Sequence, residues 1–358
     1  MHFFPGFLKR YNMKATLKMA ERGLLSDALI RLGIRKLLRN RINEIHPGNC
    51  ENHTRLLQSF INDMDENPIA INTVEANEQH YELPPLFFQK VLGKHLKYSS
   101  CYYTIGEESL DDAESAMLEI YGERAQLSDN MDILELGCGW GSLTLWMAKK
   151  YPNSRITAVS NSANQKTFID EQCKNLQINN ITILTSDMNE FQIEDRYDRI
   201  VSVEMFEHLR NYRRMLNRVS QWLRDEGKLF IHIFAHNKHP YLFEIKDDED
   251  WMSKYFFTGG MMPSDDLLHY FQDNLKLDNH WRVSGNHYSK TARDWLKKLD
   301  ANKEEILPVL TETYGKWNSK LWLQRWRIFL MSCEELFGFN DGQEWWVSHY
   351  LMTKRQNP

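Results

Sequence analysis

The chain has 358 residues, of which 42% are hydrophobic and 26% charged, and this balance is normal for a globular protein whose core needs neither disulfides nor metals. The net charge of -5 excludes the overall basic field that attracts nucleic acid. Because no apolar run approaches the roughly 20 residues that a membrane-spanning helix needs, we expect neither an integral membrane segment nor a nucleic-acid partner.

The cysteines and the first residues bear on the cellular compartment. Five cysteines are scattered without a CxxC pair, which favours a reducing environment and argues against a disulfide framework or a zinc site; they are Cys50, Cys101, Cys138, Cys173 and Cys333. The first ten residues, MHFFPGFLKR, lack the long apolar stretch and the cleavage site of a signal peptide. We therefore expect a cytoplasmic protein without a metal site.

The first quarter of the chain is expected to be helical. Apolar residues recur at helical spacing in residues 20–42 and 55–64, and we predict an N-terminal helical extension over residues 1–95. The basic segment from Arg31 to Arg41, RLGIRKLLRNR, interleaves apolar and cationic residues as an amphipathic helix does. This pattern favours a helix packed on the domain with a solvated face over a helix that lies on a membrane surface.

From residue 132 onward, short apolar runs alternate with helical segments. The runs are DILEL, RITAV, ITILT, DRIVSV and KLFIHIF, and helices are expected at 142–150, 164–175 and 212–223. Strands that alternate with helices form a parallel sheet, and strands covered on both faces are apolar throughout. The sequence therefore predicts an α/β fold with a Rossmann-like core over residues 96–236.

After residue 236 the alternation stops. Residues 237–340 are mixed and rich in aromatics, with a clear helix over 321–337, and the final run VSHYLM indicates a strand. We predict a helical, aromatic-rich cap over 237–340, inserted before a closing strand of the core sheet in 341–358. Trp281, Trp326 and Phe329 are candidates to pack against a substrate and any cationic product.

A glycine-rich turn follows the first predicted strand. The sequence DILELGCGWG places Gly137, Gly139 and Gly141 directly before a helix. A tight turn that lets a cofactor approach bare backbone needs glycine. The spacing G-x-G-x-G is shorter than the dinucleotide pattern. Glu135, just before it, suits the positive group of an amino acid and is a poor neighbour for pyrophosphate.

Polar residues after the next two strands extend this pattern. Asp187 follows the third strand, where its carboxylate can accept a hydrogen bond from an adenine amino group. The second strand ends in Ser160-Asn161, without the usual acidic residue, so the amides of Asn161 and Gln165 are candidates to bind ribose hydroxyls. The alternative for Asn161 is a plain turn residue. Together these residues favour an adenosyl amino acid over a dinucleotide.

The fourth strand runs into a cluster of ionisable residues. If the segment after this strand is helical, Glu204, Glu207 and His208 share one face, because they are spaced i, i+3 and i+4. Ligands of open parallel sheets bind beyond the carboxyl ends of the strands. We therefore predict that the three side chains converge on the reacting centre, the alternative being that they cap a helix.

Several segments resemble one enzyme family. ELGCGWGSLTLWMAKKYPNSRITAVSNSANQ, DRIVSVEMFEHLRNY and LKYSSCYYTIGEESLDDAESAML are similar to the cyclopropane-fatty-acid-synthase family of S-adenosylmethionine enzymes. GLLSDALIRLGIRKLL, NHWRVSGNHYSKTARDWLKKLDAN and FGFNDGQEWWVSHYLM resemble its coclaurine N-methyltransferase branch. The resemblance covers nearly the whole chain. It implies a class I methyltransferase sheet of seven mostly parallel strands, S-adenosylmethionine as cofactor, and Tyr98 and Ser99 closing over that cofactor.

The resemblance also assigns a substrate. The N-methyltransferase branch implies methylation of a small amine, with Glu204, Glu207 and His208 serving substrate binding and catalysis. An amine is protonated at neutral pH, so a neighbouring carboxylate or imidazole is needed to attract the cation and to take or hold its proton.

Two alternatives stay open. The lipid-cyclopropanating members of the family hold bicarbonate with Cys, Glu, His and Tyr; Glu207, His232 and Tyr288 match this pocket, whereas Ser100 stands in the place of the cysteine. This departure favours the amine over an unsaturated lipid. A catalytically silent cofactor-binding protein is the third hypothesis, and the intact glycine loop argues against it. The oligomeric state is open, a homodimer included.

Overall fold

The structure, a computed structural model, describes residues 14–71, 83–245 and 250–355. The expectation for the first ten residues therefore lies outside the described part of the chain.

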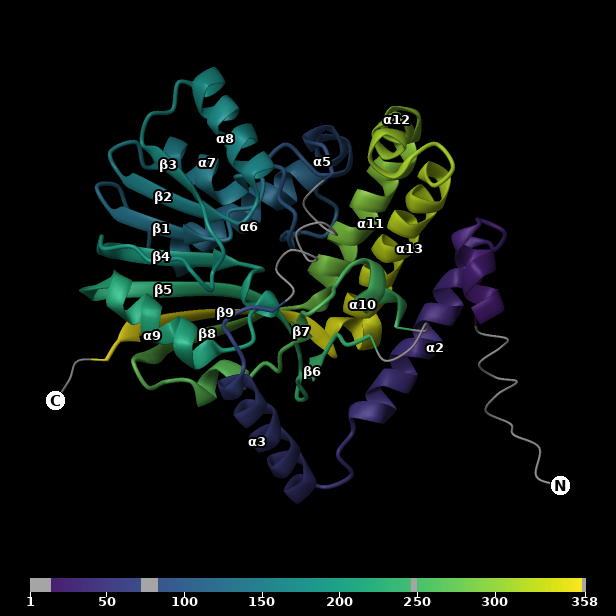
Figure 1. Ribbon diagram of the computed structural model, residues 1–358, viewed down its shortest axis with the longest axis horizontal. Helices are drawn as coiled ribbons and strands as arrows, with labels where there is room; N and C mark the ends of the chain where they lie inside the picture. Colours follow the sequence, from purple (N-terminus) through teal and green to yellow (C-terminus); the bar gives the residue numbers. More distant parts are fainter. Residues whose placement is uncertain (1–13, 72–82, 246–249, 356–358) are drawn as a thin grey trace.

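A mixed sheet of seven strands forms the centre of the molecule, in the order β3-β2-β1-β4-β5-β9-β8 (Figure 1). The first five strands in the chain pair in parallel, and β9 runs antiparallel between β5 and β8. The strands are β1 Asp132–Leu136, β2 Arg155–Ser160, β3 Ile181–Thr185, β4 Tyr197–Val203, β5 Leu223–His236, β8 Leu275–Val283 and β9 Trp345–Lys354. The predicted fold class is confirmed.

One strand of the sheet was not predicted. β8 lies inside the 237–340 region that the sequence assigns to the cap, yet it pairs with β9 along the sheet edge. Its sequence, LKLDNHWRV, buries only its first and last residues fully. An edge strand with one solvated face lacks the continuous apolar run that marks the buried strands.

Helices cover both faces of the sheet. Alternate residues of one strand bury on opposite faces, so that Ile133 packs on one side and Leu134 and Leu136 on the other. The helices that precede the cap include α2 Asp27–Ile45, α3 Cys50–Glu66, α5 Pro85–Val91, α6 Leu110–Arg124, α7 Ser142–Lys150, α8 Ala163–Leu176 and α9 Tyr212–Trp222. Buried residues of α6 and α7 belong to the Ile133 side, and those of α3 and α9 to the Leu134 side.

The C-terminal third of the chain adds the cap. Its helices α11, α12 and α13 stand together beside the sheet (Figure 1). The elements of this region, apart from β8 and β9, are the short strands β6 Tyr241–Leu242 and β7 Met261–Met262, and the helices α10 Trp251–Tyr255, η2 Leu267–Tyr270, α11 Gly285–Ala301, α12 Lys303–Tyr314, α13 Ser319–Phe337 and η3 Phe339–Gly342. The predicted helix over 321–337 is α13.

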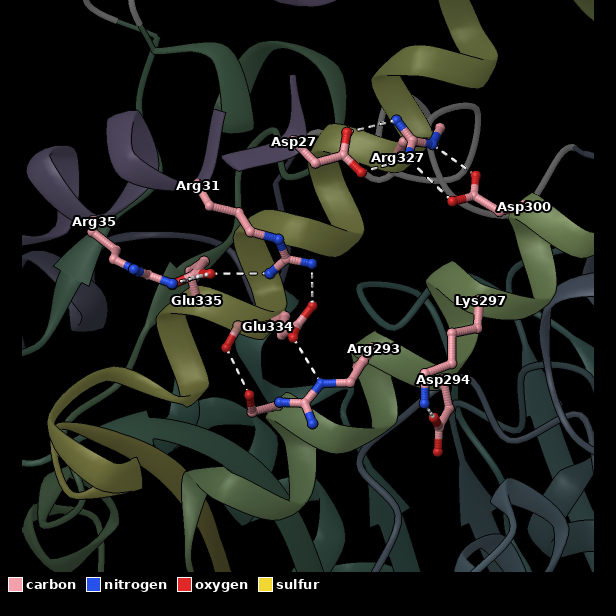
Figure 2. Close-up of polar contacts among 11 residues, drawn as sticks. Asp27, Arg31, Arg35, Arg293, Asp294, Lys297, Asp300, Arg327, Glu334 and Glu335 are labelled. Atoms are coloured by element: carbon pink, nitrogen blue, oxygen red, sulfur yellow. Dashed lines mark hydrogen bonds and ion pairs between the residues drawn. The ribbon is translucent and has the colours of Figure 1, made fainter. Parts of the chain in front are cut away.

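The basic N-terminal segment forms α2 and packs on α13. Ile30 and Ile34 are buried on the inward side of this helix. Arg31 forms ion pairs with Glu334 and Glu335 (Figure 2), with nitrogen–oxygen distances of 2.6 and 3.0 Å. Additional ion pairs in this network join Arg35 to Glu335 and Arg327 to both Asp27 and Asp300. Since these contacts link the N-terminal extension to the cap, the two parts support each other. Within the described ranges, no helix is long and apolar enough to cross a membrane.

Candidate active site

A cavity opens where β1, β2 and β4 end, below the segment that precedes α6. Eight of the nine predicted cofactor residues line it: Tyr98, Ser99, Glu135, Gly137, Gly139, Asn161, Gln165 and Asp187. The ninth, Gly141, instead begins α7 with a φ of +80°, and a Cβ on it would lie 2.8 Å from Ile169. Its role is in the close packing of the start of α7 against Ile169 of the neighbouring helix.

The glycine loop presents backbone to this cavity. Gly137 N and Cys138 N both donate to Val159 O at 3.0 Å, which ties the loop to β2. Gly139 has a φ of +53°, and a Cβ built on it would meet nothing within 4 Å. The space over Gly139 is therefore open, as a ligand that rests on bare backbone requires.

Two buried polar side chains fit an adenosyl amino acid. Gln165 Oε1 accepts a hydrogen bond from Ser160 Oγ at 2.6 Å, whereas its buried Nε2 finds no acceptor among the described residues. A buried donor without a partner suits a ligand hydroxyl. Glu135 accepts a hydrogen bond from Thr144 Oγ1 at 2.5 Å, and burial raises the pKa of its carboxyl group to about 8. A ligand cation would offset that burial penalty.

The chain turns sharply after β4. Glu204 has a φ of 47°, the left-handed region, and its N donates to His232 O at 2.9 Å. A short 3₁₀ turn over Phe206–His208 follows. The expectation that Glu204, Glu207 and His208 share one helical face is therefore wrong, because Glu204 has a left-handed backbone and the turn after it is a three-residue 3₁₀ turn.

The turn sends the three side chains to different places. Glu204 and His208 line the cavity, but Glu207 does not. Glu207 is fully buried; its Oε1 accepts a hydrogen bond from Phe234 N at 3.1 Å, and its Oε2 has no hydrogen-bond partner in the described structure. Burial, together with the charge of Glu204, raises the pKa of Glu207 well above its usual value, which favours the protonated form of this carboxyl group.

Three donors converge on the carboxyl group of Glu204. Ser100 N lies 2.9 Å and His232 Nε2 lies 3.0 Å from Oε1, and Tyr288 Oη donates to Oε2 at 2.6 Å. Burial raises the pKa of Glu204, whereas Lys97 and the donors oppose this rise. Of the four residues predicted for a bicarbonate pocket, Ser100, His232 and Tyr288 lie together around the carboxyl group of Glu204. The fourth, Glu207, lies apart from them, on Phe234 N.

Lys97 is a site residue that the sequence reasoning missed. It is 2% exposed, and its Nζ donates to Ser99 Oγ and Ser100 O, both at 2.6 Å. These bonds fix the backbone around Ser100, whose N–H donates to Glu204. Burial lowers the pKa of Lys97. Its position in the sequence could have identified it, because Lys97 directly precedes Tyr98 and Ser99, which were already expected to contact the cofactor.

His208 lies at the boundary between the cavity and the cap. Burial lowers the pKa of its imidazole to about 4, although Glu204 opposes this shift, so the ring is neutral at neutral pH. Its ring centroid is 4.8 Å from that of Phe257. A neutral imidazole beside a carboxylate can accept a proton or a hydrogen bond from a cation.

The three predicted substrate aromatics do not line this cavity. Trp326 packs between Phe87 and Phe256, at centroid distances of 4.7 and 5.1 Å, and Phe329 stacks on Phe256 at 4.4 Å. Trp281 lies on the edge strand β8. Sequence composition identified the aromatic cap, but only the fold shows that Phe256 and Phe257 stand between α13 and His208.

Comparisons with known proteins identify the family of the chain. The family described as mycolic acid cyclopropane synthetase matches residues 70–345. The chain is 39% identical over 343 residues to (S)-coclaurine N-methyltransferase of Thalictrum flavum subsp. glaucum, covering 95% of each chain. It is 30% identical over 274 residues to cyclopropane-fatty-acyl-phospholipid synthase of Escherichia coli (strain K12), covering 76% of this chain and 66% of that protein.

A solved structure is similar along almost the whole chain. The crystal structure of coclaurine N-methyltransferase bound to N-methylheliamine and S-adenosylhomocysteine superimposes with a TM-score of 0.92 at 36% identity. The match covers 96% of this chain and 100% of that chain.

Proposed function

Since the chain belongs to the mycolic acid cyclopropane synthetase family of S-adenosylmethionine-dependent methyltransferases, we propose that it methylates the nitrogen of a small amine, as its coclaurine N-methyltransferase relatives do by name. The family, the enzyme class and the cofactor that the sequence predicted are confirmed. The observation that carries the proposal is the carboxyl group of Glu204, which lies in the same cavity as the glycine loop and beside a neutral imidazole.

The cofactor supplies an electrophilic methyl group when it is bound. On the protein side, Gly139 offers open backbone, Gln165 offers an unpaired donor for a ribose hydroxyl, and Glu135 offers a carboxyl group for the amino-acid cation. Asn161 and Asp187 line the same cavity and keep the ribose and adenine roles proposed from the sequence. Tyr98 and Ser99 close it from the N-terminal side.

The amine must bind as a cation and react as a neutral base. A carboxylate in a poorly solvated site attracts an ammonium ion, and we assign this role to Glu204. The proton that the ammonium ion must lose before its nitrogen can attack passes to the neutral imidazole of His208, and the freed lone pair then takes the methyl group. The ring of Phe257 packs beside His208 and supports the imidazole from the cap side.

The same geometry disfavours lipid cyclopropanation. That reaction, as the family resemblance describes it, uses a bound bicarbonate to accept a proton. Here Ser100, His232 and Tyr288 already donate to Glu204. These donors are therefore engaged with a tethered carboxylate and not offered to a free oxyanion.

One incubation tests the proposal. Purified protein receives S-adenosylmethionine with a labelled methyl group, a panel of primary and secondary amines with aromatic bodies, and vesicles of unsaturated phospholipid. We expect label in at least one amine and none in lipid acyl chains. Label found only in the lipid would refute the proposal.

A further inference from the structure

A row of side chains crosses the sheet beside the cavity. His232 of β5 is the register partner of His349 of β9, which in turn is the register partner of Trp281 of β8. The imidazole rings of His232 and His349 lie 4.8 Å apart between centroids. Both histidines are fully buried. The row therefore begins at the Glu204 contact of His232 and ends at the sheet edge.

Helix α6 supplies the residue that closes this row. Arg124 Nη1 lies 2.8 Å from His349 Nδ1, and the guanidinium carbon lies 5.2 Å from the ring centroid of Trp281. Trp281 thus holds the arginine in place from the sheet edge. Trp281 was predicted to pack against the substrate; in the structure it packs against Arg124 instead.

The hydrogen bonds in the row run in one direction. A guanidinium has donors only, so His349 Nδ1 must accept from Arg124, and the proton of this neutral ring is on Nε2. His349 Nε2 lies 2.8 Å from His232 Nδ1, which therefore accepts. The proton of His232 is then on Nε2, 3.0 Å from Glu204 Oε1.

Burial keeps both rings in the neutral form that this direction needs. It lowers the pKa of His232 and of His349 well below the usual value, and the charges of Arg124 and Lys97 add to the shift. The hydroxyl of Tyr121 lies 2.9 Å from His232 Nδ1 and shares its lone pair. With the opposite tautomer, His232 would carry its proton on Nδ1, facing the Nε2 proton of His349.

We propose that Arg124 and His349 are positioning residues that lock His232 as a hydrogen-bond donor to Glu204. This inference rests on the proposed role of Glu204 in binding the amine. It extends the site from the cavity wall to α6 and to the sheet edge at β8. With His232 locked, Glu204 Oε1 accepts two bonds and Oε2 one, so its carboxyl group keeps one orientation toward the cavity.

Two substitutions at His349 separate the relay from simple packing. In His349→Gln, the amide oxygen can accept from Arg124 while the amide nitrogen donates to His232, so the direction is preserved. In His349→Leu, the volume is similar but both links are lost. The matched control is His280→Leu. His280 directly precedes Trp281 on β8, so its side chain lies on the opposite face of the sheet, where it contacts Asp265 and Tyr350.

The first readout needs no substrate. Protein labelled with ¹⁵N-histidine is measured at neutral pH by long-range ¹H–¹⁵N correlation, and the signals are assigned through the His232→Gln and His349→Gln variants. We expect both histidines to be neutral with the proton on Nε2. In His349→Leu and in Arg124→Met, we expect His232 to show a mixture of tautomers. A proton on Nδ1 of His232 in the wild-type protein would overturn the proposal.

The second readout is the kinetics with the amine identified in the assay above. We expect kcat to fall about 10-fold or more in His349→Leu, the effect typical of losing a partner that orients an active-site histidine, and to stay within about 3-fold in His349→Gln and His280→Leu. Equal kcat in the two His349 variants would overturn the proposal. If no amine is methylated, the proposed function fails, whereas the tautomer measurement still decides the positioning role.

Discussion

Replacing Glu204 by glutamine tests the charge of the site without changing its shape. The carboxyl group accepts hydrogen bonds from Ser100 N, His232 Nε2 and Tyr288 Oη. An amide oxygen can still accept the first two bonds at the Oε1 position. The hydroxyl of Tyr288 can rotate to accept a bond from the new amide nitrogen. We therefore expect the variant to fold with the wild-type hydrogen-bond pattern.

The expected loss follows from the missing negative charge. Two opposite charges about 4 Å apart in an effective dielectric of about 20 attract each other by about 4 kcal/mol. Each 1.4 kcal/mol corresponds to a factor of about 10. If Glu204 pairs with the ammonium form of the substrate, kcat/KM should fall by about 10²- to 10³-fold. The affinity for S-adenosylhomocysteine should change by less than about 3-fold, because the adenosyl end of the cavity is unaltered.

The assay is the initial rate of methyl transfer to the identified amine, with calorimetric titration of S-adenosylhomocysteine as the control for an intact cofactor site. Thermal unfolding of both proteins reports on the fold. A kcat/KM of Glu204→Gln within about 3-fold of the wild type would refute the assignment of Glu204 to the amine.

Three further substitutions probe the cofactor end and the core. Gly139→Val should raise the dissociation constant of S-adenosylmethionine by about 100-fold or more in calorimetry, because its side chain would fill the open space at a φ of +53°, while a cooperative unfolding transition persists; normal affinity would contradict this. Burial raises the pKa of Glu135 to about 8, so binding of the cationic cofactor at pH 7 should release a proton, detected as a buffer-dependent heat, and this release should be absent in Glu135→Gln. Folding raises the pKa of Glu207 above its usual value of 4.5. Its carboxyl group therefore favours the folded state below pH 4.5, and this contribution to stability is lost as the pH rises through the folded-state pKa. Chemical denaturation of Glu207→Gln should therefore show stability similar to the wild type at pH 4 and greater at pH 8, with kcat within about 3-fold; a variant less stable at pH 8 would argue that Glu207 is ionised.

The core fold could be predicted because its signals are local. Largely buried parallel strands such as Arg155–Ser160 give short apolar runs, and the helix over Ser142–Lys150 has clear periodicity. β8 could not be recognised, since its polar residues give no apolar run and a register shift between Leu277 and Asn279 breaks the alternation that marks a half-buried strand. Only its pairing with β9 identifies it as part of the sheet, and that pairing depends on residues more than 60 positions away.

The site was predictable where backbone geometry dictates the residue type. Gly137 and Gly139 follow from the turn, and Gln165 from its place after the second strand. The sequence could not predict that Glu204 lines the cavity while Glu207 is buried away from it, because the left-handed backbone at Glu204 decides where each side chain points. Helical spacing assumes a regular backbone, and this segment is not regular.

The left-handed backbone at position 204 has a consequence for which residues the position tolerates. A side chain there costs about 1 to 2 kcal/mol relative to the right-handed conformation, and glycine avoids that cost. With glycine at this position, Ser100 N, His232 Nε2 and Tyr288 Oη would lose their common acceptor. The space left by the carboxyl group would be about the size of a formate or bicarbonate ion. The strained backbone at position 204 therefore places a covalently attached carboxylate among these donors. Substitution of this one residue by glycine would leave the donors to bind a carboxylate from solution.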